Sequence, residues 1–434
     1  MKTRMNFKDE FYQKLKLLVL PIAIQNFMLA LVSATDAIML GWIDQTSLSA
    51  VSLAGIMAAQ YWGKQDAASI EKVIPIALRT NLLFSGLFTI LAGFCPEMLM
   101  RIFTNDAALV ASGSQYLRAV ALSYVLCGIS QVYLILLKNT GHAAVSSRIS
   151  STAVVLNIIL NAILIYGLCG APALGIRGAA YATVAARVVE LIWAYLETKK
   201  PERVRILWNR LFSSAGKILS EDFWRYTLPV LAASLVWGIA YVLYSVIMGH
   251  MGSDAVAANS ITSIAKSLLS CLIRGVSGGA GVLIGNLLGA DELEKAREYG
   301  GRLTHLAIAI GVVTGGLLML ISPAIVHFAP LTDTAAEYLQ YMLLFCGLNL
   351  MAQSVNTTVL DGIFCAGGDA KFDMQGNIGA MWCFSVPLGF LAAFWLKLPV
   401  MVVYCIVNLD EIVKLPAVYL HYKKYVWVRN ITRD

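Results

Sequence analysis

Asp36 stands in a long apolar run in which a charged side chain is unexpected. The run reads Val-Ser-Ala-Thr-Asp-Ala-Ile-Met-Leu-Gly over residues 32–41, and no Lys or Arg lies within a helical turn of the carboxylate. A carboxylate without a partner in a low-dielectric setting takes up a proton or holds a cation. The alternative is a carboxylate at the outer interface, since Gly41 follows five residues later. Asp36 is our first candidate for a proton or cation site.

Two amides, Asn157 and Asn161, lie four residues apart and therefore share one face of a helix. Amide oxygens that face a carboxylate could complete an oxygen cage for Na⁺ or relay a proton through hydrogen bonds. The alternative is that the two amides hold neighbouring helices together, which is a common use of amides within membranes. The sequence leaves both interpretations open.

Lys266, Arg274 and Asp361 are unusual charged residues in apolar segments of the second half. The two cations could pair with Asp361 or bind an anionic group of a ligand. Alternatively, Asp361 reaches the cytoplasmic interface, because the Gly367-Gly368 turn follows closely. The sequence does not decide among these.

Two further charged sets are interpreted as structural. Arg187 and Glu190 are three residues apart and are expected to form an ion pair on one helix. Asp410, Glu411 and Lys414 are expected to form a self-neutralising cluster on another helix.

Gly275-Val-Ser-Gly-Gly279 fits the G-x-S-x-G pattern of a hydrolase nucleophile. That pattern needs a strand–turn–helix context, which is missing here, so small residues that let two helices approach are the better interpretation. No nucleotide-binding P-loop pattern occurs, and the eight cysteines are scattered without a CxxC pair. The sequence therefore predicts no enzyme, no cofactor, no structural metal and no direct use of ATP.

These candidate residues must be positioned by membrane-spanning helices. The chain has 434 residues, of which 58% are hydrophobic and only 14% charged. Soluble domains average about 45–50% apolar and about 25% charged residues. Several apolar stretches approach the roughly 20 residues that cross a bilayer, and in lipid these must be helices.

The basic residues indicate the orientation in the membrane. Of the 33 Lys and Arg residues, 25 fall in the two tails and in alternate loops, and only 4 fall in the opposite loops. This positive-inside distribution predicts an inner-membrane protein with both termini in the cytoplasm. It also argues against nucleic acid as the reason for the net charge of +7.

We predict an all-α polytopic protein with twelve spans in two pseudo-symmetric six-helix lobes. The lobes are residues 1–197 and 227–434, joined by a basic cytoplasmic linker at 198–226. Features recur in order in both halves, such as Gln60–Asp66 and Asn286–Asp291. Two repeats around a central path are typical of a transporter. The expected spans are 14–40, 47–62, 73–95, 115–137, 149–168, 177–196, 227–249, 255–288, 302–328, 338–362, 374–396 and 400–420.

The second span is unusually short. The interval from Gly41 to Gly63 lacks 18 residues relative to the interval from Gly249 to Gly289. About 15 residues remain, which cover roughly 22 Å of a hydrocarbon core of about 30 Å. Either the span thins the bilayer locally or the chain carries a deletion that impairs its function.

Several motifs resemble the multidrug and toxic compound extrusion (MATE) family, in particular its bacterial DNA-damage-inducible F-like branch. The resemblance covers residues 12–425. It rests on Pro21 with Asp36, Met39–Gly41, Ala59–Lys64, Asn157–Asn161 before Tyr166-Gly167, Gly178–Thr183, Ile284–Gly289, Cys365–Asp369 and Asp410–Lys414.

The resemblance implies export of amphipathic, often cationic, drugs in exchange for Na⁺ or H⁺. It also implies a cation site in the first lobe and a bend at Pro21 that couples this site to the drug path. The implied cation-site residues are Asp36, Asn157, Asn161, Thr183 and the backbone of Ala179.

Two positions depart from the family pattern. Asn161 stands where many relatives have an acidic residue, which leaves the coupling ion open. Ser234 aligns with a position that is often glutamate, so an acidic coupling site in the second lobe is in question. With Lys266, Arg274 and Asp361, Ser234 forms the candidate substrate or charge network of that lobe.

Three functions are weighed. The first is drug antiport by a monomer whose partners are a drug-like small molecule and the lipid bilayer. The second is flipping of a lipid or polyisoprenoid-linked precursor, to which Lys266 and Arg274 point because flippases of the wider superfamily have basic cavities. The third is an inactive membrane protein with a broken second span.

Overall fold

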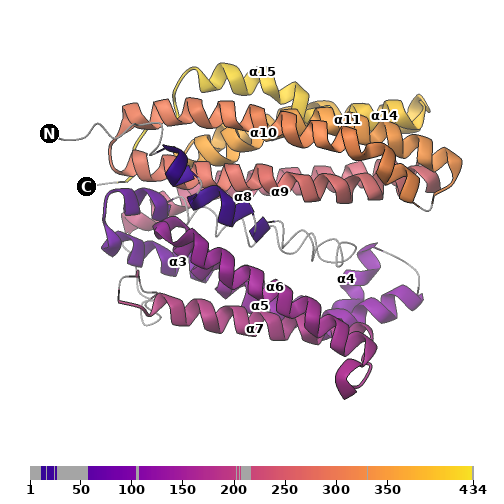
Figure 1. The fold of residues 1–434 in the computed structure, drawn as a ribbon, viewed down its shortest axis with the longest axis horizontal. Coiled ribbons are helices and arrows are strands. Elements are labelled where there is room, and N and C mark those ends of the chain that lie inside the picture. The colour runs from indigo at the N-terminus through magenta and orange to yellow at the C-terminus, as the bar shows by residue number, and fades with distance from the viewer. Residues whose placement is uncertain are drawn as a thin grey trace. The chain divides into compact units, whose positions relative to one another are not determined.

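The computed structural model describes residues 11–15, 17–23, 25–26, 57–103, 107–201, 203–204, 206, 217–329 and 331–432. All regular elements among these residues are helices (Figure 1). The predicted all-α fold is confirmed. It follows from the apolar composition, because a helix satisfies its backbone polar groups within one segment.

Eight stretches of the described residues are long and apolar enough to cross a membrane. One of them, Gly113–Tyr166, contains two helices, because Thr140 and Gly141 leave the helical conformation. The count of twelve spans stays a prediction, since residues 27–56 fall outside the described part of the chain. The short span at 47–62 also stays a prediction, because only its last residues, from 57 on, are described.

The helices group into two compact units. Unit 1 comprises Met1–Ala34 and Tyr226–Asp434, and unit 2 comprises Thr35–Arg225. The first residues of the chain therefore pack with the second half of the sequence. The predicted lobes follow the repeat in the sequence, whereas the units follow the packing of the helices. The bounds of the lobes stay a prediction.

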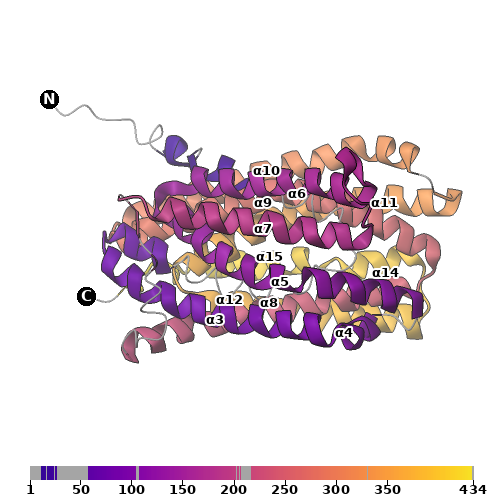
Figure 2. The same ribbon diagram turned by 90° about the horizontal axis from the view of Figure 1, so that it is seen from below.

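Unit 2 is built around α5, which packs against α3 and α7, while α6 packs against α7. Figures 1 and 2 both show α6 running beside α7. Beyond a helical stretch at 57–63, its elements are α3 (Ala67–Phe94), α4 (Pro96–Phe103), α5 (Ala107–Leu137), η1 (Lys138–His142), α6 (Ala143–Tyr166), η2 (Leu168–Gly170) and α7 (Ile176–Thr198).

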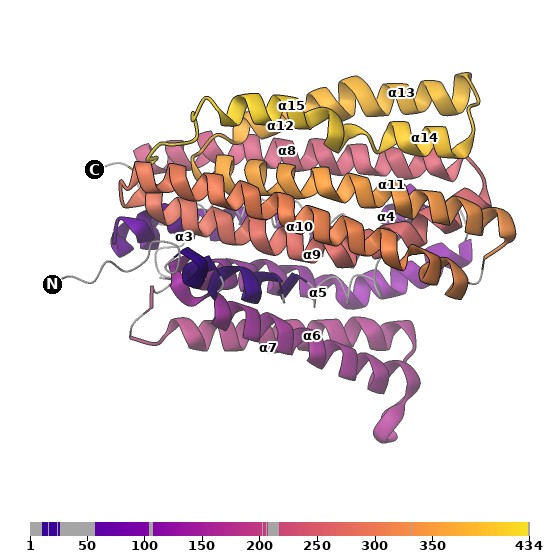
Figure 3. The ribbon, with the colours of Figure 1, turned by 45° about the horizontal axis from the view of Figure 1, so that its top comes forward.

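Unit 1 is built around α9, α10 and α11, which pack against one another (Figure 3). The helix α8 (Lys217–Gly249) enters unit 1 at Tyr226. The elements that follow it in unit 1 are α9 (Ser253–Gly289), α10 (Leu293–Phe328), α11 (Asp333–Thr357), η4 (Thr358–Phe364), α12 (Ala370–Asn377), η5 (Ile378–Ser385), α13 (Val386–Phe390), η6 (Leu391–Trp395), α14 (Val400–Val407) and α15 (Asp410–Tyr422).

The helical residues between 11 and 26 lie against a groove of small residues on α9. A side chain at Gly275 would come within 2.6 Å of the Ala23 Cβ, and one at Gly279 within 2.7 Å of a Val19 methyl carbon. Phe11 is fully buried in the core cluster of unit 1, edge-on to Tyr299. The small residues of the Gly275–Gly279 motif therefore serve helix packing, as predicted.

Turns at matching places in the two halves have the same geometry. Gln65 and Asp291 both adopt positive φ, at 61° and 60°. Their amides bond to carbonyls three residues earlier, at Trp62 and Leu288. Gly141 and Gly368 also match, with φ of 81° and 73°. The repeat read from the sequence thus extends to local backbone structure.

The last predicted span, 400–420, is interrupted. α14 ends at Val407 and α15 begins at Asp410, with Asn408 between them at φ −98° and ψ 13°. The carbonyl of Asn408 accepts a hydrogen bond from Asn349 Nδ2 at 2.6 Å, which satisfies a backbone group that the break releases. Broken helices at membrane depth occur where backbone is buried in protein or lines a cavity.

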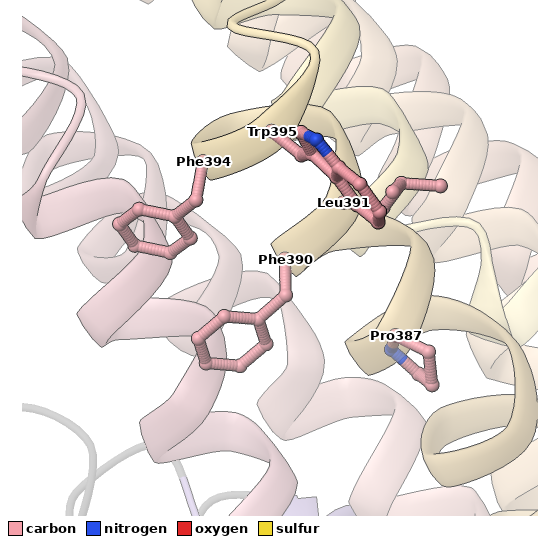
Figure 4. Close-up of a pocket in the computed structure, with 5 residues that line it drawn as sticks. All are labelled: Pro387, Phe390, Leu391, Phe394 and Trp395. Atoms are coloured by element: carbon pink, nitrogen blue, oxygen red, sulfur yellow. The ribbon is translucent and has the colours of Figure 1, made fainter.

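An aromatic surface on α13 and η6 is exposed. In Figure 4, Phe390 and Phe394 lie along one side of the helix and Pro387, Leu391 and Trp395 along another. Trp395 is 81% exposed. A tryptophan two residues before a lysine, here Lys397, at the end of an apolar segment is typical of the membrane interface. We assign this surface to contact with lipid rather than to a ligand.

Candidate functional site

Four of the five residues predicted for the cation site lie together in unit 2. Asn161 Nδ2 donates to Asn157 Oδ1 at 3.2 Å, and Asn157 Nδ2 donates to Thr183 Oγ1 at 3.2 Å. The Thr183 hydroxyl then donates to the Ala179 carbonyl at 3.0 Å. One continuous chain of hydrogen bonds therefore links α6 to α7. The fifth residue, Asp36, lies outside the described residues.

A close helix contact positions these groups. A side chain at Gly178 would overlap the backbone carbonyl of Leu164, so only glycine lets the start of α7 approach the end of α6. The connection is also fixed by Leu174 N, which donates to Leu164 O at 2.9 Å. Ala179 and Thr183 are thereby held within reach of the two asparagines.

The chain of amides leaves one acceptor unfilled. Asn161 Oδ1 is buried and has no hydrogen-bond partner among the described residues. A buried acceptor without a partner is costly and rare, and a hard cation or a protonated carboxyl group would satisfy it. Among the described residues, no group of three or more His, Cys, Asp or Glu side chains could hold a metal ion. A cation here would take amide, hydroxyl and carbonyl oxygens.

The predicted structural pair in unit 2 is confirmed. Arg187 Nη1 lies 2.7 Å from Glu190 Oε2, and the Ser130 hydroxyl donates to the other carboxylate oxygen at 3.1 Å. Glu190 is only 1% exposed. The pair therefore joins α7 to α5 inside the unit.

Pro21 and Ser234 are both helical residues of unit 1. Pro21 lies in the helical stretch 17–23, and the bend expected there stays a prediction. The Ser234 hydroxyl donates to Val230 O of its own helix at 3.0 Å. Ser234 does not line the pocket that Lys266 and Arg274 share.

Lys266 and Arg274 line one pocket of unit 1, and Asp361 is not part of its lining. Lys266 Nζ donates to Asn349 Oδ1 at 3.1 Å. Asp361 lies in the π-helical turn η4 and is exposed. Within the described residues, no ion pair of 4.0 Å or less joins either cation to Asp361. Neither cation therefore forms a close ion pair with Asp361, although the charge of Arg274 acts on Asp361 from farther away.

The cluster on α15 is confirmed as self-neutralising. Lys414 Nζ lies 3.1 Å from Glu411 Oε1 and 3.8 Å from Asp410 Oδ2. The sequence reasoning missed how far this network extends. Asn356 Nδ2 donates to Glu411 Oε2 at 2.7 Å, and Lys414 donates to Asn377 Oδ1 at 3.2 Å.

A signal for the missed residues was available in the sequence. Asn349 and Asn356 are seven residues apart, which places both on one face of the helix that contains them. Amides on one face of an apolar span favour hydrogen bonds to a neighbouring helix. The position of Asp373 in the sequence indicates a buried network less clearly, because Asp373 stands beside a polar turn. In the structure its Oδ1 accepts a hydrogen bond from Asn377 Nδ2 at 3.1 Å.

The sequence model described as MatE matches residues 54–163 and 229–391, which is more than half of the chain. The chain belongs to the MATE family. Members of this family are membrane transporters rather than enzymes. Together with the apolar helices, membership makes this chain a multi-pass protein of the inner membrane.

Curated relatives align over nearly all of this MATE protein. It is 20% identical to the "Uncharacterized transporter YisQ" of Bacillus subtilis, with 94% of each chain covered. It is also 20% identical to the "Probable multidrug resistance protein YoeA" of the same bacterium, with 99% of this chain and 97% of YoeA covered. Identity to the "Probable multidrug resistance protein NorM" of Thermotoga maritima is 24%, over 90% of this chain and 87% of NorM.

Solved transporters share the fold. An outward-facing multidrug resistance MATE transporter of the MOP superfamily superposes with a TM-score of 0.83 at 18% identity, and 95% of each chain is covered. A MOP superfamily transporter from Pyrococcus furiosus, titled for the reverse polarity of its binding pocket, gives 0.82 at 18% identity, again over 95% of each chain. At this identity the likeness establishes the fold alone.

Proposed function

We propose that this MATE transporter exports amphipathic, often cationic, organic compounds in exchange for Na⁺ or H⁺ by alternating access. Full-length relatives described as probable multidrug resistance proteins support the export of drugs. The observation that carries the coupling proposal is the hydrogen-bond chain from Asn161 to Ala179, with its unfilled acceptor at Asn161 Oδ1.

In this mechanism Asp36 binds the coupling ion beside that chain. An ionised Asp36 is costly within the membrane, and a proton or a Na⁺ removes that cost. Neutralisation then favours the arrangement that releases drug outside. Coupling follows if drug and ion prefer different arrangements, because each ligand shifts the equilibrium only by its differential affinity. A bend at Pro21 would transmit the change.

Several finer features belong to the same proposal. We place the protein in the DNA-damage-inducible F-like branch, as a monomer with both termini in the cytoplasm. Its lobes are residues 1–197 and 227–434, joined by the linker at 198–226. The short second span is compatible with transport in this proposal, so the wild-type chain should be active.

Ethidium uptake into everted membrane vesicles tests the function, because export then runs from the medium into the lumen. Ethidium is added outside the vesicles, and the lumen holds the higher Na⁺ concentration or, separately, the higher proton concentration. The expected result is that one gradient drives export into the lumen in the wild type and that Asp36→Asn abolishes it. The matched control is Asp291→Asn, an exposed aspartate in a left-handed turn that asparagine also tolerates.

Two results would contradict the proposal. Efflux that persists in Asp36→Asn under the same gradient would remove Asp36 from the coupling mechanism. If neither gradient moves ethidium or a panel of other cationic dyes in the wild type, the drug-export function itself fails.

A second candidate function is the flipping of an anionic lipid precursor. The observation that favours it is the shared pocket of Lys266 and Arg274 in unit 1. A fluorescent anionic phospholipid in reconstituted vesicles distinguishes the two functions. Flipping requires transfer between leaflets that depends on the protein, whereas drug export requires gradient-driven dye efflux without such transfer.

A further inference from the structure

A small cavity within unit 1 combines charge, aromatic surface and an interrupted helix. Its volume is about 40 Å³, which accommodates a water molecule or the charged head of a larger ligand. Residues from α8, α9 and α11 line it, together with Asn408, Asp410 and Glu411 at the break between α14 and α15. Discontinuous helices of this kind form the ligand sites of many transporters.

The two carboxylates in the lining are already neutralised. Glu411 accepts hydrogen bonds from Lys414 at 3.1 Å and from Asn356 at 2.7 Å. Asp410 lies 3.8 Å from the same lysine. Both carboxylates therefore have Lys414 beside them, and among the described residues neither lies within 4.0 Å of Lys266 or Arg274, although Lys266 attracts both from farther away.

The two cations in the lining have no acidic partner within 4.0 Å among the described residues. Lys266 donates to a neutral amide, that of Asn349, and the carboxylates of Asp410 and Glu411 attract it from farther away. Arg274 is exposed and forms no hydrogen bond or close ion pair with the described residues, and the acidic residue whose charge it influences is Asp361. A cation within a membrane protein is expensive unless an anion or a chain of acceptors compensates it. An anionic group that enters the cavity would supply this compensation.

An unpartnered hydroxyl supplies a further donor. Ser270 lines the cavity, is 2% exposed, and its hydroxyl has no hydrogen-bond partner among the described residues. A buried hydroxyl normally finds an acceptor. With the lysine and the arginine it makes three donors from one helix, α9, which suits an oxyanion that accepts several hydrogen bonds.

An aromatic wall accompanies these donors. Trp237 and Tyr241 of α8 line the same cavity, and their rings stack at 5.1 Å between centroids with an interplanar angle of 18°. A flat apolar body attached to the anionic head could lie against these rings. Such a wall favours an amphipathic ligand over a simple inorganic anion.

We propose that this cavity binds the sulfonate, carboxylate or phosphate head of an amphipathic organic anion, with Lys266 and Arg274 as its charge partners and Ser270 as a donor. The substrate range of the transporter then includes organic anions as well as cations. The statement about substrates rests on the export function proposed above. The binding statement does not, and it can be tested on protein that transports nothing.

Isothermal titration calorimetry on the full-length protein in detergent tests the binding. The probe is 1-naphthalenesulfonate, and the comparison ligand is 1-naphthalenesulfonamide, which has the same ring and nearly the same head without the charge. We expect the sulfonate to bind at least about tenfold more tightly, as is typical of charge-assisted hydrogen bonds. Equal affinity for the two ligands would overturn the proposal.

Substitutions assign the effect to the cavity. Arg274→Gln and Lys266→Gln should each weaken sulfonate binding about tenfold and leave sulfonamide binding unchanged. Arg274→Lys should retain part of the affinity, which distinguishes lost charge from lost folding. The matched control is Lys371→Gln, which removes an exposed positive charge of the same unit. Wild-type affinity for the sulfonate in both glutamine variants would refute the assignment.

Competition identifies the source of the anion. Displacement of the sulfonate by added phosphatidylglycerol, but not by phosphatidylcholine, would support the site and assign it to a lipid head. Displacement by soluble aryl carboxylates alone would support it as a site for soluble anions. If no anion competes, the sulfonate is bound through its ring and the proposal fails. Ethidium efflux in the same variants reports separately on the export function.

Discussion

The two units share turn geometry but differ at their candidate sites. In unit 2, beside the separate Arg187–Glu190 pair, two asparagines, a threonine and a carbonyl form a neutral chain. Unit 1 holds an ionic network in which Lys414 serves two carboxylates. An unfilled neutral acceptor costs less than an unpaired buried charge, although both are unfavourable. The comparison teaches that the neutral centre has a vacant acceptor for a ligand, while the charged cluster is held together by its own partners.

The largest expected effect comes from breaking the ionic network. Lys414→Met should destabilise the protein by about 3–5 kcal/mol, because it leaves Asp410 and Glu411 buried without their cation. Chemical unfolding in detergent micelles measures this, and exposed Lys371→Met is the control. A loss below about 1 kcal/mol would mean that the carboxylates are already neutral without Lys414.

Alanine at the matched turn glycines tests the shared scaffold. Gly141→Ala and Gly368→Ala should each cost about 1–2 kcal/mol, because both positions are left-handed. We expect the larger loss at Gly368, since its carbonyl also accepts from Arg429 Nη2 at 2.6 Å. The melting temperatures of the two variants are measured side by side. If only one variant melted at a lower temperature than the wild type, the two turns would not be structurally equivalent.

The helices α3 and α10 follow the matched turns at Gln65 and Asp291, and their stability should respond differently to loss of the N-cap side chain. The Asp66 side chain accepts from Ser69 N at 3.0 Å and caps α3, whereas the Glu292 side chain makes no capping bond to α10. Asp66→Ala should therefore cost about 1 kcal/mol, and Glu292→Ala should be nearly neutral. Equal losses for the two variants would show that capping is not the cause.

The contribution of Asp66 should also depend on pH. Burial raises the pKa of Asp66, but the hydrogen bonds from Ser69 and the charges of Lys64 and Lys72 outweigh it and hold the pKa below 3.8. Because the folded pKa is depressed, the added stability is complete above the unfolded pKa of about 3.8 and is lost as pH falls through the folded value. At pH values below the folded pKa of Asp66, the wild type and Asp66→Ala should therefore have the same free energy of unfolding.

A small effect on stability is expected in the neutral chain. Asn157→Leu removes two hydrogen bonds and should cost about 1 kcal/mol, since a hydrogen bond between membrane helices averages about 0.6 kcal/mol. Gradient-driven ethidium efflux should nevertheless fall strongly, because the substitution interrupts the chain between Asn161 and Thr183. Normal coupling in this variant would leave the chain a purely structural role.

Much of the fold was readable from the sequence, because lipid leaves a chain few options. Apolar length and the absence of strand-forming alternatives predict helices, and Gly141 and Gly368 mark turns that recur in the structure. The pairs Arg187–Glu190 and Glu411–Lys414 were predictable from their spacing on one helix.

Contacts between distant segments could not be read in the same way. The break at Asn408 is stabilised by a hydrogen bond from Asn349 of another helix, and the residues near 408 do not predict this contact. Asn356 reaches Glu411 across 55 residues. The meeting of Asn157 with Thr183 was inferred from resemblance alone, because the approach of the two helices depends on a single glycine at 178.

The contact between the residues around Ala23 and the glycines of α9 can form only after most of the intervening chain has been synthesised. Roughly 250 residues of chain separate the two surfaces, and at about 5–20 residues per second translation needs roughly 10–50 s to produce the second one. Until α9 is made, the apolar side chains around Ala23 can contact only lipid, which is as apolar as they are. Their packing against the glycines of α9 is therefore a late step in the assembly of unit 1.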